Sequence, residues 1–118
     1  MCRLLIPKLI ESNGHITNIA SGAGLLAPGG MAAYASSKFA LRGMTQTWQA
    51  ELRKFNVRVT QVNPSEVTTA FANEERVERE EVSNKLNSQE VADTIVSTLK
   101  MRDKGFIPEV TIWATNPF

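Results

Sequence analysis

The sequence predicts an α/β protein in which helices cover a small parallel sheet. Six helix-like and strand-like segments alternate along the 118 residues, beginning with a helix and ending with a strand. This alternation is typical of parallel sheets, whose strands are joined by helices. The strand candidates are short, rich in β-branched residues and bounded by glycine or proline, as buried strands are. A chain of this length has room for one domain.

The first half of the chain contains a helix end, a strand, a loop and a long helix. Residues 1–11 place leucines at near-helical spacing, which indicates the end of a helix whose beginning is missing. Residues 15–20 form the first strand candidate. Residues 21–33 are rich in glycine and alanine and are expected to form a loop. Residues 34–55 carry apolar side chains at helical spacing and predict a long helix.

The second half begins with a strand and a charged segment. Residues 58–63 form the second strand candidate, which Pro64 ends. Residues 65–85 are irregular and rich in charge, and within them residues 74–81 are expected to form a solvated helical face with internal ion pairs.

A capped helix and a last strand complete the chain. Asn87 is expected to cap this helix, with the side chain of Glu90 reaching back from its third position. The helix is expected to end near Gly105. Residues 108–114 form the final strand candidate.

The composition argues against several classes of function. The 13 basic and 12 acidic residues give a net charge of +1, so no basic surface for nucleic acid is expected. A single cysteine, Cys2, and a single histidine, His15, do not make a metal site, and His15 is expected to be structural or solvent-facing, not catalytic. No apolar stretch is long enough to cross a bilayer, and the signal-peptide pattern is missing. These features favour a soluble, cytoplasmic protein.

Tyr34 and Lys38 are the residues most suggestive of chemistry. Residues four apart on a helix lie one above the other, so the Lys38 ammonium is expected close to the Tyr34 phenol. A nearby positive charge favours the phenolate, and such a tyrosine can exchange a proton with a carbonyl or alcohol oxygen. Ser21 lies thirteen residues earlier, at the end of a strand candidate, and its loop can fold back to the phenol. Taken alone, the Tyr–Lys pair also fits an ordinary solvated surface.

Three motifs that follow one another along the chain favour a catalytic Tyr–Lys pair over an ordinary surface pair. Asn-Ile-Ala-Ser closes the first strand at Ser21, Tyr-Ala-Ser-Ser-Lys opens the long helix, and Val-Asn-Pro-Ser-Glu-Val-Thr-Thr follows the second strand at residues 62–69. This combination resembles the short-chain dehydrogenase/reductase superfamily over nearly the whole chain. Residues 106–117 are similar to the tails of members labelled 3-oxoacyl-[acyl-carrier-protein] reductase.

The resemblance implies a partial domain. Residues 1–118 would be the carboxyl-terminal half of a Rossmann-type doubly wound parallel sheet, truncated at the amino terminus, with the glycine-rich cofactor-binding half absent. The strand at residues 15–20 would then lack a neighbour on one side. Residues 22–27 match the glycine-rich dinucleotide signature, but Pro28 follows instead of a helix. This stretch is therefore interpreted as a loop lining the substrate pocket.

The resemblance also implies roles for individual residues. Tyr34 would be the acid/base, Lys38 would activate it and bind the nicotinamide ribose, and Ser21 would polarise the substrate oxygen. The cofactor would be NAD or NADP, with NADPH slightly favoured, and the substrate a small carbonyl compound or alcohol. The nicotinamide carboxamide would be held by Pro64, Ser65, Val67 and Thr69. Ser65 replaces the glycine usual in the family, and Glu66 adds an acid beside it. In the family, the region after the carboxamide-binding segment forms a lid over the substrate, so the resemblance gives residues 74–81 an alternative role in gating.

Two hypotheses about the protein follow. The first is an oxidoreductase half with little activity of its own, in a family whose members form homo-oligomers through the helix that begins at Tyr34. The second is a non-catalytic interaction module that uses this helix together with the helix ending near Glu11, because the resemblance implies that family members dimerise through both.

Overall fold

The computed structural model describes residues 2–72 and 75–118, and its centre is a parallel sheet of three strands. The strands β1 (His15–Ile19), β2 (Arg58–Pro64) and β3 (Glu109–Ile112) lie side by side in that order. In the register, His15 is opposite Arg58, and Gln61 is opposite Glu109. The predicted fold class, about three parallel strands with flanking helices, is confirmed.

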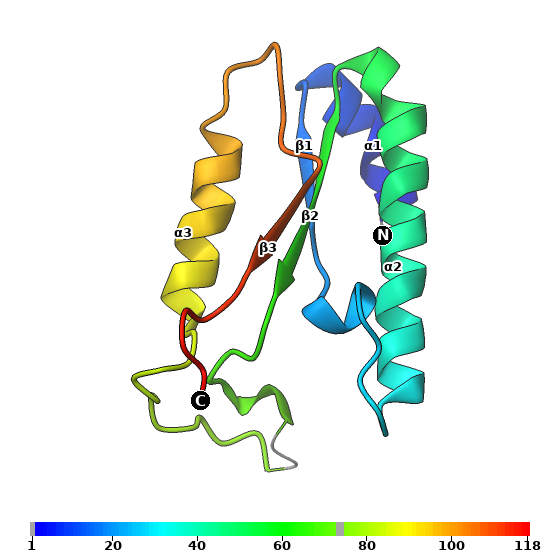
Figure 1. Cartoon of the computed structure of the whole chain (residues 1–118). Helices are drawn as coiled ribbons and strands as arrows, with labels where there is room; N and C mark the ends of the chain where they lie inside the picture. Colours follow the sequence, from blue (N-terminus) through cyan, green and yellow to red (C-terminus); the bar gives the residue numbers. More distant parts are fainter. Residues whose placement is uncertain (1, 73–74) are drawn as a thin grey trace.

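Helices cover both faces of this sheet (Figure 1). The helices α1 (Cys2–Glu11) and α2 (Ala32–Leu52) lie on one face, and α3 (Ser88–Leu99) lies on the other. Three short 3-10 turns complete the elements: η1 (Gly22–Gly24), η2 (Arg53–Phe55) and η3 (Ala70–Ala72). The helix carrying Tyr34 therefore begins two residues earlier than predicted and ends at Leu52, where η2 tightens the chain.

The hydrophobic core lies between the sheet and the first two helices. Its buried members are Ile16 of β1, Val59 of β2, and Leu52 and Val57 at the turn that leads from α2 into β2. Alternate residues of a strand point to opposite faces, so Gln61 and Asn63 share this helical face with Val59. The partly buried side chains that pack against the cluster are Ile6, Leu9, Ile10 and Trp48.

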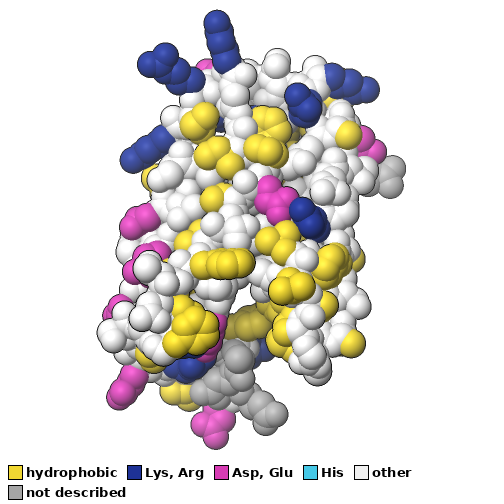
Figure 2. Space-filling view, in the orientation of Figure 1, with side chains coloured by type: hydrophobic (Ala, Val, Ile, Leu, Met, Phe, Trp, Pro, Cys, Tyr) yellow, Lys and Arg dark blue, Asp and Glu magenta, His cyan; other side chains and the backbone are white. Residues whose placement is uncertain are grey.

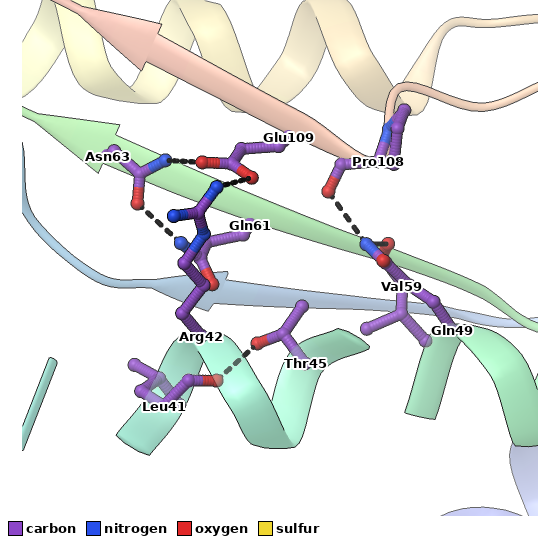
Figure 3. A network of polar contacts seen from close by, with 9 residues as sticks. All are labelled: Leu41, Arg42, Thr45, Gln49, Val59, Gln61, Asn63, Pro108 and Glu109. Atoms are coloured by element: carbon purple, nitrogen blue, oxygen red, sulfur yellow. Dashed lines mark hydrogen bonds and ion pairs between the residues drawn. The ribbon is translucent and has the colours of Figure 1, made fainter. Parts of the chain in front are cut away.

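A polar network fixes α2 to the sheet (Figure 3). Nη2 of Arg42 donates to Oε2 of Glu109 at 3.2 Å, and Nδ2 of Asn63 donates to Oε1 of the same carboxylate at 2.9 Å. Nε2 of Gln61 in turn donates to Oδ1 of Asn63 at 2.7 Å. Further along the helix, Gln49 reaches the carbonyl oxygens of Val59 and Pro108. The position of α2 is thereby set relative to both β2 and β3.

The second half of the chain differs from the prediction at two places. The capping box of Asn87 and Glu90 is confirmed, but α3 ends at Leu99 instead of near Gly105. Residues 75–81 are not helical, and Glu74 lies outside the described residues. The Arg79 side chain pairs with Glu66, which lies outside this stretch.

The far side of β1 is an open sheet edge among the described residues. The sheet order ends at β1, which pairs only with β2. The amide of Ala20 donates to the carbonyl of Val62, so by alternation the backbone groups of His15, Thr17 and Ile19 point away from β2. The Ile19 side chain is 52% exposed. The open edge expected from the sequence is therefore present.

Candidate active site

Ser21 lies where β1 ends and begins the turn η1. Its backbone is extended, and its Oγ accepts the N–H of Ala23 at 3.1 Å, so it caps this turn. The hydroxyl proton of Ser21 remains available to another acceptor, because the capping bond uses only a lone pair. Among the described residues, no hydrogen bond joins Ser21 to Tyr34 or Lys38.

Lys38 connects the helix to the end of the first strand. Its Nζ lies 5.6 Å from the centroid of the Tyr34 ring, on the same face of α2. The same ammonium donates to the carbonyl oxygen of Ile19 at 3.3 Å, two residues before Ser21. An ammonium has three protons, so this bond leaves donors free for a further partner. Lys38 thus brings the phenol and the strand end into one neighbourhood.

Two glycines show how closely the turn after Ser21 packs. A β-carbon added at Gly24 would lie 3.1 Å from the carbonyl oxygen of Lys38, so η1 rests directly on the backbone of α2. A β-carbon added at Gly22 would lie 3.8 Å from the carbonyl oxygen of Pro64, at the end of β2. The predicted substrate-pocket loop therefore contains a packed turn that touches both α2 and β2.

The segment after β2 runs past the same end of the sheet. The N–H of Thr68 donates to the carbonyl of Leu86 at 2.8 Å, and the Val67 bridge to Leu86 holds this stretch extended. Oγ1 of Thr69, the predicted carboxamide ligand, accepts the N–H of Phe71. Oγ1 of Thr68 is buried without a hydrogen-bond partner among the described residues. Sequence reasoning missed Thr68, because its position in the chain does not distinguish its hydroxyl from that of the neighbouring Thr69.

An aromatic contact connects that segment to Tyr34. The ring of Phe71 in η3 lies 6.1 Å from the Tyr34 ring, centroid to centroid, with the planes tilted by 56°. Phe71 is itself largely exposed. The segment that follows β2 therefore reaches across to the amino-terminal end of α2, as a covering segment would.

The charges beside this segment are paired. Glu66 accepts hydrogen bonds from Lys85 at 2.5 Å and from Arg79 at 3.5 Å. The hydrogen bond from Lys85 lowers the pKa of the Glu66 carboxyl, and the charge of Arg79 acts in the same direction. Ser65, the other departure from the family pattern, accepts the N–H of Ala114 through its Oγ. Ser65 and Glu66, the two departures from the family pattern, therefore both form hydrogen bonds with other residues of the chain.

Neither a metal site nor a membrane helix is found where the structure describes the chain. Residues 2–72 and 75–118 hold no cluster of three or more ligand-type side chains. Within the same residues, no helix is both long and apolar enough to span a bilayer.

The sequence comparisons point to one family. Residues 1–80 match the family model described as short chain dehydrogenase. An uncharacterized oxidoreductase of Staphylococcus epidermidis is 34% identical over 108 residues, which are 91% of this chain and 46% of the relative. The 3-ketodihydrosphingosine reductase of Dictyostelium discoideum is 31% identical over 109 residues, covering 84% of this chain and 33% of that protein.

Solved structures of dehydrogenases have the same fold as this chain. A serine dehydrogenase complexed with NADP+ superposes with a TM-score of 0.82 at 25% identity, covering 95% of this chain and 49% of that one. A short chain dehydrogenase from Burkholderia cenocepacia in complex with NADP has a TM-score of 0.77 at 29% identity, covering 95% of this chain and 43% of that one. The chain thus spans half or less of the length of these relatives. It belongs to the short chain dehydrogenase family.

Proposed function

We propose that this chain supplies the acid/base half of an NAD(P)-dependent oxidoreductase that interconverts a carbonyl compound and a secondary alcohol. The observation that supports the proposal best is the position of the Lys38 ammonium. It lies between the Tyr34 ring and the carbonyl of Ile19, beside the turn that Ser21 begins. The 3-oxoacyl-[acyl-carrier-protein] reductase subgroup remains a prediction.

Tyr34 would hold the mobile proton. When the substrate is a ketone, its phenol would donate a proton to the carbonyl oxygen; when it is an alcohol, the phenolate would accept one. The Lys38 ammonium, 5.6 Å from the centre of the Tyr34 ring, would lie beside the phenol during this exchange. The Ser21 hydroxyl, whose proton its capping bond leaves available, would donate to the same oxygen and fix its position.

The residues present fit a nicotinamide group at the carboxyl ends of the strands. Lys38 has ammonium donors beyond its bond to Ile19, which suit ribose hydroxyls. The buried, unpaired hydroxyl of Thr68 offers a partner for an amide in the segment formed by Pro64, Ser65, Val67 and Thr69. The dinucleotide, when bound, supplies or accepts the hydride. NAD and NADP both remain candidates, with NADPH slightly favoured.

The activity is proposed for a larger assembly, and this chain alone is expected to have little or none. In a chimera, residues 1–118 would replace the matching carboxyl-terminal part of the Staphylococcus epidermidis relative. Tyr34→Phe should lower turnover of secondary alcohols by about 100-fold or more, because the phenol proton is lost. Binding of the dinucleotide should persist, as followed by nicotinamide fluorescence.

Ser36→Ala provides the matched control. Ser36 lies in the same helical turn as Tyr34 and is exposed, so its hydroxyl should not affect the reaction. Turnover of the Tyr34→Phe chimera at the level of Ser36→Ala would refute the role assigned to the phenol.

A second candidate function is favoured by exposed apolar side chains on α2. Phe39 and Met44 are both partly exposed, and an added β-carbon at Gly43 would meet nothing within 4 Å. We propose that the exposed side of α2 around Phe39 and Gly43 pairs with its copy in a second subunit or in a full-length relative. Sizing chromatography of the mixed proteins tests the idea, and Gly43→Glu should abolish a complex without a clash inside the chain. Absence of any co-eluting complex would remove this candidate.

A further inference from the structure

A hollow of about 430 Å³ lies beside the segment proposed to hold the nicotinamide ring. Figure 2 shows hydrophobic side chains around a hollow at the carboxyl end of the sheet. The volume lies in the range of small-molecule sites. The residues that define the hollow for this argument are Ser65, Glu66, Lys85, Trp113, Pro117 and Phe118.

Three segments that are distant in sequence build the hollow. Ser65 is fixed to the end of β3, because its N–H donates to the carbonyl of Ile112 at 2.8 Å and its Oγ accepts the N–H of Ala114 at 3.4 Å. Nδ2 of Asn84 donates to a main-chain oxygen of Phe118 at 3.3 Å. The tail after β3 is therefore attached at both ends, and it forms one wall of the hollow.

The chemistry of the lining is apolar, with its charges compensated. The only carboxylate among the six side chains, Glu66, is paired with Lys85 and, outside the hollow, with Arg79. Trp113 is 72% exposed, and Phe118 is fully exposed, although both are large aromatic side chains. Exposed apolar surface of this kind, gathered around a hollow, is characteristic of a binding site.

We propose that this hollow accepts the uncharged, apolar arm of the substrate, an alkyl or aryl group attached to the reacting carbon. The inference rests on the proposed function, because Ser65 and Glu66 belong both to the hollow and to the segment beside the proposed nicotinamide position. It goes beyond that function by naming a substrate class: hydrophobic ketones and the corresponding secondary alcohols.

Tryptophan emission of the full chain tests the proposal directly. The probes are unbranched methyl ketones of increasing length. Each should change the emission of Trp113 in a saturable way, and affinity should rise by about four-fold for each methylene that becomes fully buried. Trp113→Phe should abolish the optical signal, because the second tryptophan, Trp48, packs against the core. A signal that survives this substitution would place the ligand elsewhere and overturn the proposal.

Two aromatic substitutions provide a matched pair. Phe118→Ala should weaken binding by about five-fold, because an aromatic wall of the hollow is lost. Phe55→Ala removes a partly exposed ring in η2, at the opposite end of the strands, and should leave affinity unchanged. Equal weakening in both variants, or an affinity that does not depend on ketone length, would contradict the proposal.

This assay requires neither cofactor nor turnover, so its failure can be separated from failure of the proposed function. If no ketone binds but Tyr34→Phe strongly lowers turnover of the chimera, only the proposed role of the hollow is rejected. Length-dependent binding together with an unaffected Tyr34→Phe chimera would reject only the acid/base role.

Discussion

Gly24 determines how closely the turn that begins at Ser21 can approach α2. An added β-carbon there would lie 3.2 Å from the Cβ of Lys38 as well as 3.1 Å from its carbonyl oxygen. The obstacle on the helix side is backbone, which cannot rotate away. At Gly22 the nearest atom would be at 3.8 Å, an ordinary contact. An added methyl group is therefore expected to fit more easily at Gly22 than at Gly24.

Gly24→Ala should destabilise the chain by about 1–3 kcal/mol, because the turn and the helix must separate to admit the methyl group. Gly22→Ala should cost distinctly less, and it controls for the general effect of replacing glycine in this turn. Urea unfolding of the two variants and the parent protein gives the comparison. Equal losses would show that the contact with Lys38 does not limit the position of the turn.

Of the two roles that the sequence left open for His15, structural or solvent-facing, its hydrogen bond to Thr60 supports the structural one, and its burial makes folding depend on pH. Oγ1 of Thr60 donates its proton to the carbonyl of Ile107, so Nε2 of His15 must donate to that hydroxyl, at 2.7 Å. Nδ1 is buried without a partner among the described residues. Burial, together with the positive charge of Arg58, lowers the pKa of His15 below its ordinary value of 6.5.

Because the folded-state pKa is the lower one, the unfolded chain binds a proton first as the pH falls. The contribution of neutral His15 to stability should therefore be complete above pH 6.5 and should be lost progressively below it, until the folded-state pKa is passed. Urea midpoints measured from pH 7.5 to about 5 should fall, whereas His15→Gln should have a flatter profile over the same range. Identical profiles would mean that another group controls this dependence.

The sequence predicted the candidate site where helical spacing decides the geometry. Tyr34 and Lys38 share a face of α2 because they are four residues apart, and Lys38 reaches the ring as expected. The unpaired hydroxyl of Thr68 could not be anticipated, because it depends on the contact of this segment with Leu86, which is distant in sequence. The catalytic roles themselves remain proposals.

At the scale of elements, Glu109 links the helix that carries the candidate acid/base to two strands. Its carboxylate accepts from Arg42 of α2 and from Asn63 of β2 (Figure 3). Asn63 is fully buried, so its amide cannot turn to water when that acceptor is removed. Nδ2 of Asn18 in β1 also donates to Oγ1 of Thr45 in α2, which gives the helix a second attachment.

Glu109→Ala should destabilise the chain by about 1–3 kcal/mol, because it leaves the buried Asn63 amide without its acceptor. Glu109→Gln retains an acceptor oxygen and the shape of the side chain, and it should cost less. Thermal unfolding of the two variants distinguishes the outcomes. A Gln variant as unstable as the Ala variant would show that the charge of Glu109, and not the buried hydrogen bond, holds the helix.

Local signals predicted most elements, and the failures have physical causes. Alternating patterns and the Asn87 capping box gave the order of strands and helices, because these signals lie within a few residues of each other. The helical face expected at residues 74–81 was wrong for the described residues 75–81, where charge alone provides no apolar stripe to pack. The Arg79 side chain instead bonds to Glu66, a contact that charge patterning cannot reveal.

At the scale of the whole molecule, the chain matches about half of the length of larger parallel-sheet proteins, and its candidate site lies at one end of its sheet. Solved relatives of about twice its length share this part of the fold, and β1 has an open edge where the structure describes it. The Lys38 ammonium lies on that edge, bonded to the outward-pointing carbonyl of Ile19. A parallel strand added to β1 by another polypeptide would therefore come next to the candidate site.

The convergence of the Ser21 turn, Tyr34 and Lys38 at this end of the sheet is the claim on which the account depends. NMR cross-relaxation between Gly24 and Lys38 tests it most directly, because these residues are fourteen apart in sequence yet pack backbone to backbone. Cross-peaks are predicted from the Gly24 α-protons to the Lys38 α- and β-protons, and from the single tyrosine ring to Phe71. Assigned spectra without a Gly24–Lys38 cross-peak would contradict the claim.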